Sequence, residues 1–209
     1  MALHLYVGSQ RLSSWSLRPY LALVHAGAAF ETTTIALDRD TTRGAIANVN
    51  PAGRVPVLHH DGAVIWDSLA ICEYVHELFP QATLWPDDCA RRAVARSISA
   101  EMHSGFAALR GAMPMDLGGS WPGRGHTPEA LADASRIQAI WRDQLAASGG
   151  PFLFGAFTIA DAMFAPVTTR FTTYGVELDA ACRGYVAAIA ALPAMKRWCE
   201  DAAAEPARG

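Results

Sequence analysis

One stretch constrains the fold of this chain more than any other: residues 50–58, which read Asn-Pro-Ala-Gly-Arg-Val-Pro-Val-Leu. The pattern predicts a turn and then a strand that opens at the Val55–Pro56 bond. Proline has no backbone donor and can hold a cis peptide, so it is confined to strand starts and edges. A cis Pro56 would expose the backbone of Val55 to a ligand. An ordinary edge strand explains the same residues without any ligand.

A second motif begins nine positions after the end of that block. Asp67 and Ser68 precede apolar residues at helical spacing, and they are therefore predicted to open a helix. The free amide groups and the positive dipole end of a helix N-terminus attract a carboxylate. Next to an exposed Val55 backbone, they would form a cradle for a small extended peptide. The alternative is a capped helix with a structural role alone.

The first 80 residues alternate between strand and helix patterns. Strands are predicted at residues 3–7, 30–37, 55–59 and 63–66, and helices at 14–25, 41–49 and 68–79. Asp61-Gly62 is typical of a hairpin turn between the last two strands. Pro19 is tolerated only in a first turn, so the first helix should begin near Ser16 or kink. The order β-α-β-α-β-β-α predicts a small α/β domain.

The rest of the chain has a helical pattern. Residues 81–88 lack periodicity and carry prolines, which is typical of a linker. Helices are predicted at residues 89–110, 127–147 and 158–174, with two shorter segments ending near Ala203. Thr158 and Asp161 have the spacing of a capping box, in which Asp161 accepts a hydrogen bond from the Thr158 amide. Residues 113–126, which include Trp121, are long for a helix connection and could be functional.

Composition excludes several function classes. The net charge is −3 with no run of basic residues, so a nucleic acid or an anionic membrane has no electrostatic support. The N-terminus lacks the basic region of a signal peptide, and no window approaches the ~18 apolar residues of a membrane span. The cysteines are scattered and the seven histidines lack metal-ligand spacing, so we expect free thiols, no metal and a cytoplasmic location.

Three serines surround a tryptophan where the first strand leads into the first helix. We call residues 13–16, Ser-Ser-Trp-Ser, the serine loop. Ligands of open α/β sheets bind at the carboxyl ends of strands, so this loop should face the turn before Pro56. A serine hydroxyl and a helix N-terminus together lower the pKa of a bound thiol. Simple helix capping is the structural alternative.

Two other uses of these residues have less support. A Ser-His-Asp hydrolase would need a Gly-x-Ser-x-Gly turn, which is absent from the sequence. His25, His59 and His60 also have no evident carboxylate to orient them. Arg18 and Arg54 could each pair with a ligand carboxylate, although such arginines are more often solvated or in structural ion pairs.

The motifs together resemble the glutathione transferase superfamily over nearly the whole chain. Three blocks occur at the family's customary intervals: residues 50–58, Asp-Ser-Leu-Ala-Ile-x-Glu-Tyr at 67–74, and Gly-x-x-Thr-x-x-Asp at 155–161. The serine loop is most similar to the serine classes, particularly zeta, although Trp15 replaces the zeta cysteine. That replacement weighs against the maleylacetoacetate isomerase activity associated with the zeta class.

The resemblance implies a domain organisation and a partner. A thioredoxin-like domain at residues 1–80 would bind glutathione, and an all-helical domain at 89–209 would hold the acceptor pocket, with residues 81–88 as the linker. It also implies a homodimer. Neither Ser13 nor Ser16 is the cysteine that redox relatives carry at these positions, which argues against dithiol–disulfide chemistry.

The resemblance also assigns roles to single residues. Ser13 takes the thiol-activating position, with Ser14 as the near alternative. Val55 would pair its backbone with the cysteinyl unit. Asp67 would hold the γ-glutamyl ammonium and Ser68 the γ-glutamyl carboxylate, while Arg54 would approach the glycyl carboxylate.

Three functions follow from this resemblance. The first is a glutathione transferase that conjugates the thiolate to a small electrophile. Its acceptor pocket would be lined by His103, Phe106, Arg110 and Met113, with the Trp121 loop as a lid. The second is a zeta-like, glutathione-dependent cis–trans isomerase. The third is a non-catalytic binding module with the same fold.

Overall fold

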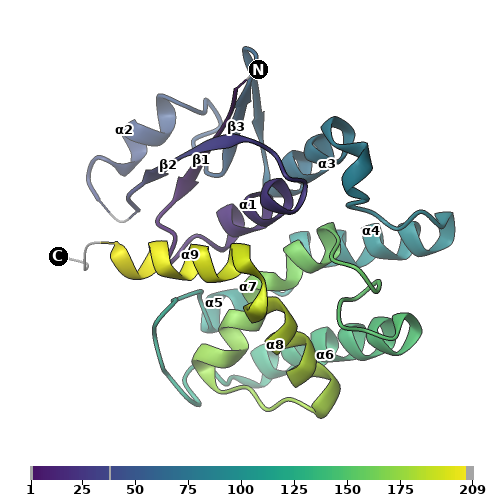
Figure 1. The fold of residues 1–209 in the computed structure, drawn as a ribbon. Helices are drawn as coiled ribbons and strands as arrows, with labels where there is room; N and C mark the ends of the chain where they lie inside the picture. The colour runs from purple at the N-terminus through teal and green to yellow at the C-terminus, as the bar shows by residue number, and fades with distance from the viewer. Residues whose placement is uncertain (1, 38, 206–209) are drawn as a thin grey trace.

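The first part of the chain is a mixed sheet covered by helices. The computed structural model describes residues 2–37 and 39–205. Its elements, in chain order, are β1 (Leu3–Gly8), α1 (Ser14–His25), β2 (Phe30–Ile35), α2 (Thr42–Ala47), β3 (Val57–His60), β4 (Ala63–Trp66) and α3 (Ser68–Leu78). The strands are ordered β2-β1-β3-β4, with β2 parallel to β1 and with β3 and β4 each antiparallel to its neighbour (Figure 1).

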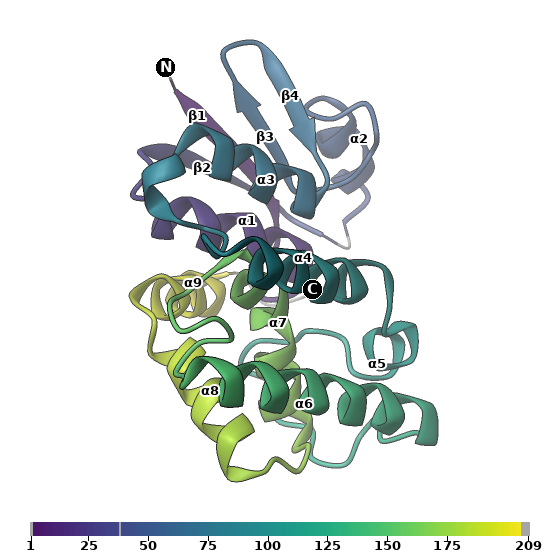
Figure 2. The same cartoon turned by 90° about the vertical axis from the view of Figure 1, so that its right-hand side faces the viewer.

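The second part of the chain is helical. A 3₁₀ turn (Pro80–Ala82) leads to α4 (Cys89–Ser104), α5 (Ala107–Ala112), α6 (Pro128–Ser148), α7 (Ile159–Tyr174), α8 (Ala180–Ala191) and α9 (Pro193–Ala204). In Figure 2 the sheet lies above and the helical domain below, with α4, α7 and α9 near the boundary. Within the described ranges, every helix is too short or too polar to cross a lipid bilayer.

The core runs through both domains without a break. Leu5 and Val7 of β1 are fully buried beneath α1, whose Leu17 is also buried. α1 packs against both α3 and α7, and nearly every residue of α7 is buried. Burial on all sides explains the weak amphipathic pattern of α7. The serine loop, which forms the N-cap and the first turn of α1, therefore lies where the two domains meet.

The predicted fold class and element order are confirmed, and three details are corrected. β3 begins at Val57 rather than Val55, because the Val55–Pro56 bond is cis and pairing with β4 starts after it. α1 begins at Ser14 and contains Pro19, so the alternative start near Ser16 is wrong. The boundaries of the domains and of the linker at residues 81–88 stay a prediction.

The third detail concerns the helix predicted over residues 89–110, which is broken in two. Phe106 has a φ of 59°, in the left-handed region, so the chain cannot continue as one helix through it. A Cβ atom at Gly105 would lie 2.7 Å from the Glu101 carbonyl oxygen, so only glycine fits this break.

The capping box predicted at the start of α7 is present: the Asp161 carboxylate accepts a hydrogen bond of 2.8 Å from the Thr158 amide.

Candidate functional site

A cavity of about 400 Å³ joins the two predicted motifs, and we call it the cradle. It is lined by residues of the sheet domain together with one from α4: Trp15, Arg54, Val55, Pro56, Trp66, Asp67, Ser68 and His103. The cis bond before Pro56 turns the chain just ahead of β3. No other described residue pairs with the amide or carbonyl of Val55, so both groups can bond an extended ligand.

The N-terminus of α3 forms the opposite side of the cradle. Asp67 caps this helix by accepting hydrogen bonds from the amides of Leu69, at 2.9 Å, and Ala70, at 3.2 Å. Its φ of 75° turns the chain sharply from β4 into the helix. The Ser68 hydroxyl is buried, yet it has no hydrogen-bond partner in the described part of the chain. Because an unsatisfied buried hydroxyl is costly, Ser68 is suited to bind a polar ligand group.

His103 reaches the cradle from α4 in the helical domain. Its Nε2 atom lies 3.1 Å from Asp67 Oδ2, the carboxylate oxygen that the helix cap does not use. Its ring also contacts the edge of Trp15, with 5.3 Å between ring centroids. His103 was predicted to line the acceptor pocket, and it instead faces the predicted γ-glutamyl end.

The hydroxyl groups of the serine loop are bonded inside the protein. Ser13 Oγ lies 2.7 Å from Ser16 Oγ, which also accepts a hydrogen bond of 3.1 Å from the Gly8 amide. Ser14 Oγ accepts a hydrogen bond of 3.1 Å from Nη2 of Arg170, a residue of α7. Ser13 and Ser14 are both buried, and neither lines the cradle. Trp15, the residue that follows them, does line it.

Buried arginines surround this loop. The guanidinium of Arg18 lies 4.3 Å from the Trp15 ring centroid and that of Arg110 lies 4.6 Å from it, distances typical of cation–π contacts. Arg18 is fully buried, and none of its three side-chain nitrogens has a hydrogen-bond partner among the described residues. Burial, then the charges of Arg110 and Arg170, hold the pKa of Arg18 well below its usual range.

Arg170 connects the helical domain to the serine loop. Besides Ser14, its Nε donates to the Met113 carbonyl at 2.9 Å. Burial, and then the charge of Arg110, lower the pKa of Arg170 to about 10, so it remains a cation at neutral pH. Positive charge therefore gathers directly behind the serine loop.

Two of the four predicted acceptor-pocket residues lie in the core, and the acceptor role of all four stays a prediction. Met113 is fully buried and Phe106 nearly so, because both side chains belong to the core between the domains. Arg110 donates to the carbonyls of Met102 and Gly105, which holds it against Trp15. The prediction took these residues from the first helix of the helical domain, and the structure breaks that segment at Gly105.

A second cavity, of about 450 Å³, lies where the predicted lid reaches the other domain. Arg11 and Leu12 line it from the segment before the serine loop, and Trp121 and Arg124 line it from the helical domain. The Trp121 loop is held in place, since the Trp121 amide donates to the Thr173 carbonyl at 2.7 Å. Its indole nitrogen donates to Asp116 at 3.0 Å.

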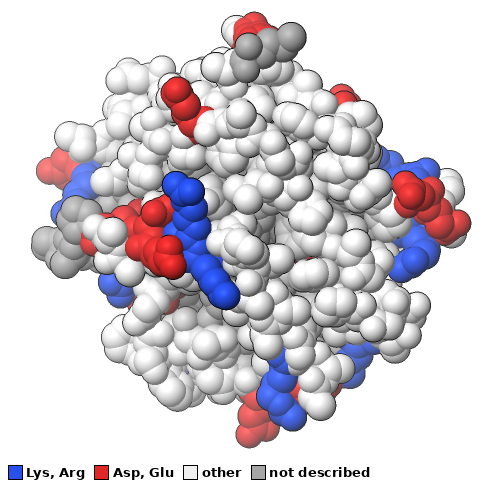
Figure 3. Space-filling view, viewed as in Figure 1, with Lys and Arg blue, Asp and Glu red and all other residues white. Residues whose placement is uncertain are grey.

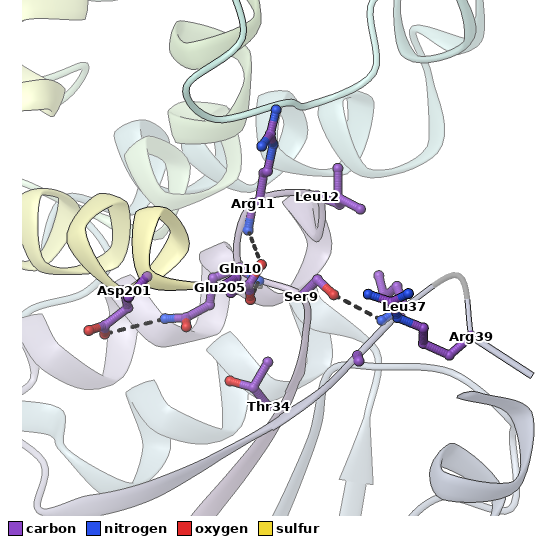
Figure 4. Close-up of a pocket in the computed structure, with 11 residues that line it drawn as sticks. Ser9, Gln10, Arg11, Leu12, Thr34, Leu37, Arg39, Asp201 and Glu205 are labelled. Carbon is purple, nitrogen blue, oxygen red and sulfur yellow. Dashed lines mark hydrogen bonds between the residues drawn. The ribbon is translucent and has the colours of Figure 1, made fainter. Parts of the chain in front are cut away.

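A third cavity, of about 510 Å³, lies between β2 and the end of α9 (Figure 4). The Glu205 carboxylate accepts hydrogen bonds from the amides of Gln10 and Arg11, the latter at 3.3 Å. The Leu37 amide donates to Ser9 Oγ at 2.9 Å on the other side of the same segment. These contacts fix the chain leading into the serine loop.

The described residues contain no His, Cys, Asp or Glu group arranged to hold a metal ion. The face drawn in Figure 3 is mostly uncharged; charged side chains of both signs lie together left of its centre, and others lie near its rim. Cys72 and Cys182 are buried free thiols; burial raises the pKa of the Cys72 thiol strongly, and mainly burial raises that of Cys182 to about 12. Neither cysteine is a reactive thiolate.

Matches to known proteins cover both domains. The family model described as glutathione S-transferase, N-terminal domain, matches residues 12–78, and that of the C-terminal domain matches 124–201. A maleylacetoacetate isomerase from Pseudomonas aeruginosa is 30% identical over 97% of this chain and 92% of its own. A probable maleylacetoacetate isomerase from Caenorhabditis elegans is 37% identical over 50% of this chain and 49% of its own.

A solved structure is similar over the full length. It is a glutathione transferase homolog from Burkholderia GL BGR1 with bound glutathione, 25% identical, with a TM-score of 0.75, and the match covers 98% of this chain and all of that one. The family models together match more than half of the chain, and the Pseudomonas relative matches it nearly from end to end. This chain therefore belongs to the glutathione S-transferase family.

Proposed function

We propose that the cradle binds glutathione in an extended form. The observation that carries this proposal is the unpaired Val55 backbone facing an unpartnered, buried Ser68 hydroxyl in one cavity. Val55 would pair with the cysteinyl unit, and Ser68 with the amides of α3 would hold the γ-glutamyl carboxylate. Arg54, which lines the same cavity, would approach the glycyl carboxylate. The bound glutathione in the Burkholderia relative supports this choice of ligand.

Asp67 would hold the γ-glutamyl ammonium. One of its oxygens caps α3, and the other lies 3.1 Å from His103, so the ammonium would share the second oxygen with the imidazole or replace it. A carboxylate that bonds a cation forms one of the stronger hydrogen bonds in proteins. Asp67 should therefore make the largest single contribution to glutathione affinity.

The reaction we propose is addition of the glutathione thiolate to a small electrophile. The thiol proton leaves to water, and a serine hydroxyl at residue 13 or 14 donates a hydrogen bond to the sulfur. Each unit by which the thiol pKa falls corresponds to about 1.4 kcal/mol of stabilisation of the thiolate. The sulfur then bonds the electrophilic carbon. In a substitution the leaving group departs with the electron pair of the broken bond; in an addition the π pair moves to the far atom of the double bond, which then takes a proton from water.

The acceptor would bind in the cavity that Trp121 lines, because Arg11 and Leu12 bring that cavity next to the serine loop. The enzyme would work as a cytoplasmic homodimer, as the family resemblance implies.

Glutathione-dependent cis–trans isomerisation is the second candidate, and the names of the Pseudomonas and Caenorhabditis relatives favour it. In that reaction the thiolate adds to a cis double bond, the new single bond rotates, and elimination returns the thiolate. Both reactions begin with the same ionised sulfur. Trp15 at the place of the zeta cysteine distinguishes this chain from that class.

Isothermal calorimetry with reduced glutathione tests the binding proposal, and we expect heat at millimolar or lower concentration. An assay panel of aryl halides, unsaturated ketones and a cis dicarboxylic enone then separates conjugation from isomerisation by product. Binding without turnover of any acceptor would favour a non-catalytic module. No heat and no thermal shift would remove the proposal altogether.

A further inference from the structure

One buried contact joins the two domains directly at the serine loop. Arg170 of α7 donates from Nη2 to Ser14 Oγ, across 156 positions of sequence. Arg170 is 4% exposed and Ser14 is 5% exposed, so water does not compete for this hydrogen bond. Arg170 Nε also donates to the Met113 carbonyl, which fixes the plane of the guanidinium. Hydrogen bonds therefore hold the guanidinium of Arg170 at both its Nε and its Nη2 atoms.

The donor and acceptor roles in this contact are determined by chemistry. A guanidinium has only donors, so Ser14 Oγ must be the acceptor and its own O–H must point elsewhere. Accepting a hydrogen bond from a cation polarises a hydroxyl and makes it a better donor. In contrast, Ser13 and Ser16 bond each other through two hydroxyls, either of which can donate. Of these three hydroxyls, only that of Ser14 accepts a hydrogen bond from a charged side chain among the described residues, and its hydrogen is free for another partner.

We propose that Arg170 is a positioning residue that makes Ser14, rather than Ser13, the hydroxyl that donates to the glutathione sulfur. This inference rests on the proposed function and adds to it the activating serine and its partner from the other domain. In the activation step the S–H bond breaks and its proton leaves to water. The electron pair stays on sulfur, and Ser14 donates to it while remaining a neutral hydroxyl.

Two neighbouring arginines support this role. Arg18 and Arg110 lie against Trp15, the residue after Ser14, and Arg18 has no hydrogen-bond partner in the part of the chain that the structure describes. An excess of buried positive charge stabilises a thiolate brought beside it. Arg170 differs from these two because it alone of the three has a hydrogen bond to a serine of the loop among the described residues.

The experiment measures the pKa of the thiol of bound glutathione by thiolate absorbance, in the full chain. We expect Arg170→Gln and Ser14→Ala each to raise this pKa by about one unit or more, and Ser13→Ala to raise it much less. A lysine side chain keeps the positive charge, so Arg170→Lys should restore part of the shift. Arg136→Gln, which removes an exposed pair with Glu101, is the matched control and should leave the pKa unchanged.

A double variant separates positioning from a general structural effect. If Arg170 acts through Ser14, Arg170→Gln should add little to the thiol pKa once Ser14 is alanine, but should act fully beside Ser13→Ala. Glutathione affinity should change less than about threefold in Arg170→Gln while kcat falls about tenfold, because the loss is confined to thiolate formation. Equal effects of Arg170→Gln in both serine backgrounds would overturn the proposal.

Two further outcomes are decisive. If Arg170→Gln does not fold, the Ser14→Ala and Ser13→Ala variants decide alone, and an equal or larger effect of Ser13→Ala refutes the assignment. If the unmodified protein binds glutathione with a lowered thiol pKa that no Arg170 variant changes, this inference fails while the proposed function stands. If the unmodified protein shows no binding, the proposed function fails first.

Discussion

The N-termini of α3 and α7 are built from similar residues but are used in opposite ways. At α7, Asp161 accepts hydrogen bonds from the Leu153 and Thr158 amides and from the Thr158 hydroxyl, and it is fully buried. At α3, Asp67 caps the helix from an exposed position, and the Ser68 hydroxyl stays unpaired in a cavity. A carboxylate of the chain accepts amide hydrogen bonds at both ends, but of the two only the α3 end lines the cradle, where we propose that a ligand binds.

Stability against pH should give the largest difference between these two ends. Burial raises the pKa of Asp161 to about 6, and its hydrogen bonds offset only part of that effect. An acid whose folded pKa is raised contributes stability that is full below its unfolded pKa and lost as pH rises through the folded value. Between pH 4 and 6 the free energy of unfolding should therefore fall by about 3 kcal/mol relative to Asp161→Asn.

Urea unfolding at several pH values measures the contribution of Asp161 to the free energy of unfolding. Asp179, at the start of α8, provides a control whose contribution changes with pH in the opposite direction. The hydrogen bond from the Cys182 amide, and then Arg142, lower the pKa of Asp179, so its contribution is lost as pH falls. Asp179→Asn should flatten the acid side of the profile. Identical profiles for the native protein and Asp161→Asn would contradict the assignment to Asp161.

Asp67→Asn should have the next largest effect, and on binding rather than on folding. Loss of a charge-assisted hydrogen bond to the γ-glutamyl ammonium should weaken glutathione binding by about tenfold to a hundredfold. Asparagine can still cap the helix, so the melting temperature should change little. Calorimetry on Asp67→Asn and on Asp61→Asn, in the exposed hairpin turn, makes the comparison. Similar affinities for the two variants would rule out the ammonium site.

Two serine substitutions compare a hydroxyl that is hydrogen-bonded inside the protein with one that has no partner among the described residues. The first should affect stability and the second glutathione binding. Ser16→Ala removes a partner of the Gly8 amide and of Ser13, and it should lower the free energy of unfolding by about 1–3 kcal/mol. Ser68→Ala removes a hydroxyl without a partner in the described chain, so stability should hold while glutathione affinity falls about fivefold. A Ser68→Ala protein that is less stable but binds glutathione with unchanged affinity would contradict a binding role for Ser68.

The smallest effect is expected at His103. Its contact with Asp67 is partly exposed, and such pairs contribute about 0–1 kcal/mol. If the imidazole competes with the ligand ammonium, His103→Gln should tighten glutathione binding by no more than about fivefold. Weaker binding in a calorimetric titration would instead mean that His103 contacts glutathione itself.

Short-range motifs singled out Val55, Asp67 and Ser68, which belong to local patterns of proline and helix-cap residues, and the structure brings the three to one cavity. The fold class likewise follows from the alternation of strand and helix periods. The sequence analysis did not single out Arg170, and it assigned His103 to the acceptor pocket. Each of these residues meets its partner only because the helical domain packs on the sheet domain. The position of Arg170 within the apolar pattern of α7 could have indicated its importance. An arginine is rarely buried unless a partner pairs with it.

The acceptor-pocket prediction relied on a helix that the structure breaks. It assumed one continuous helix over residues 89–110, and the left-handed Phe106 ends that helix at Ser104. A positive φ is rare for a bulky residue, so nothing in the sequence indicated a break at Phe106. After the break, Met113 points into the core, and the lining of the second cavity comes from its neighbours Gly111, Ala112, Pro114 and Met115.

The Glu205 carboxylate bonds the amides of Gln10 and Arg11, and this has a practical meaning for protein engineering. The last described residue of the chain acts as an anchor for the segment that leads to Ser13. Shortening α9, or pulling its end away with a fused domain, would release two backbone donors a few positions along the chain from the serines.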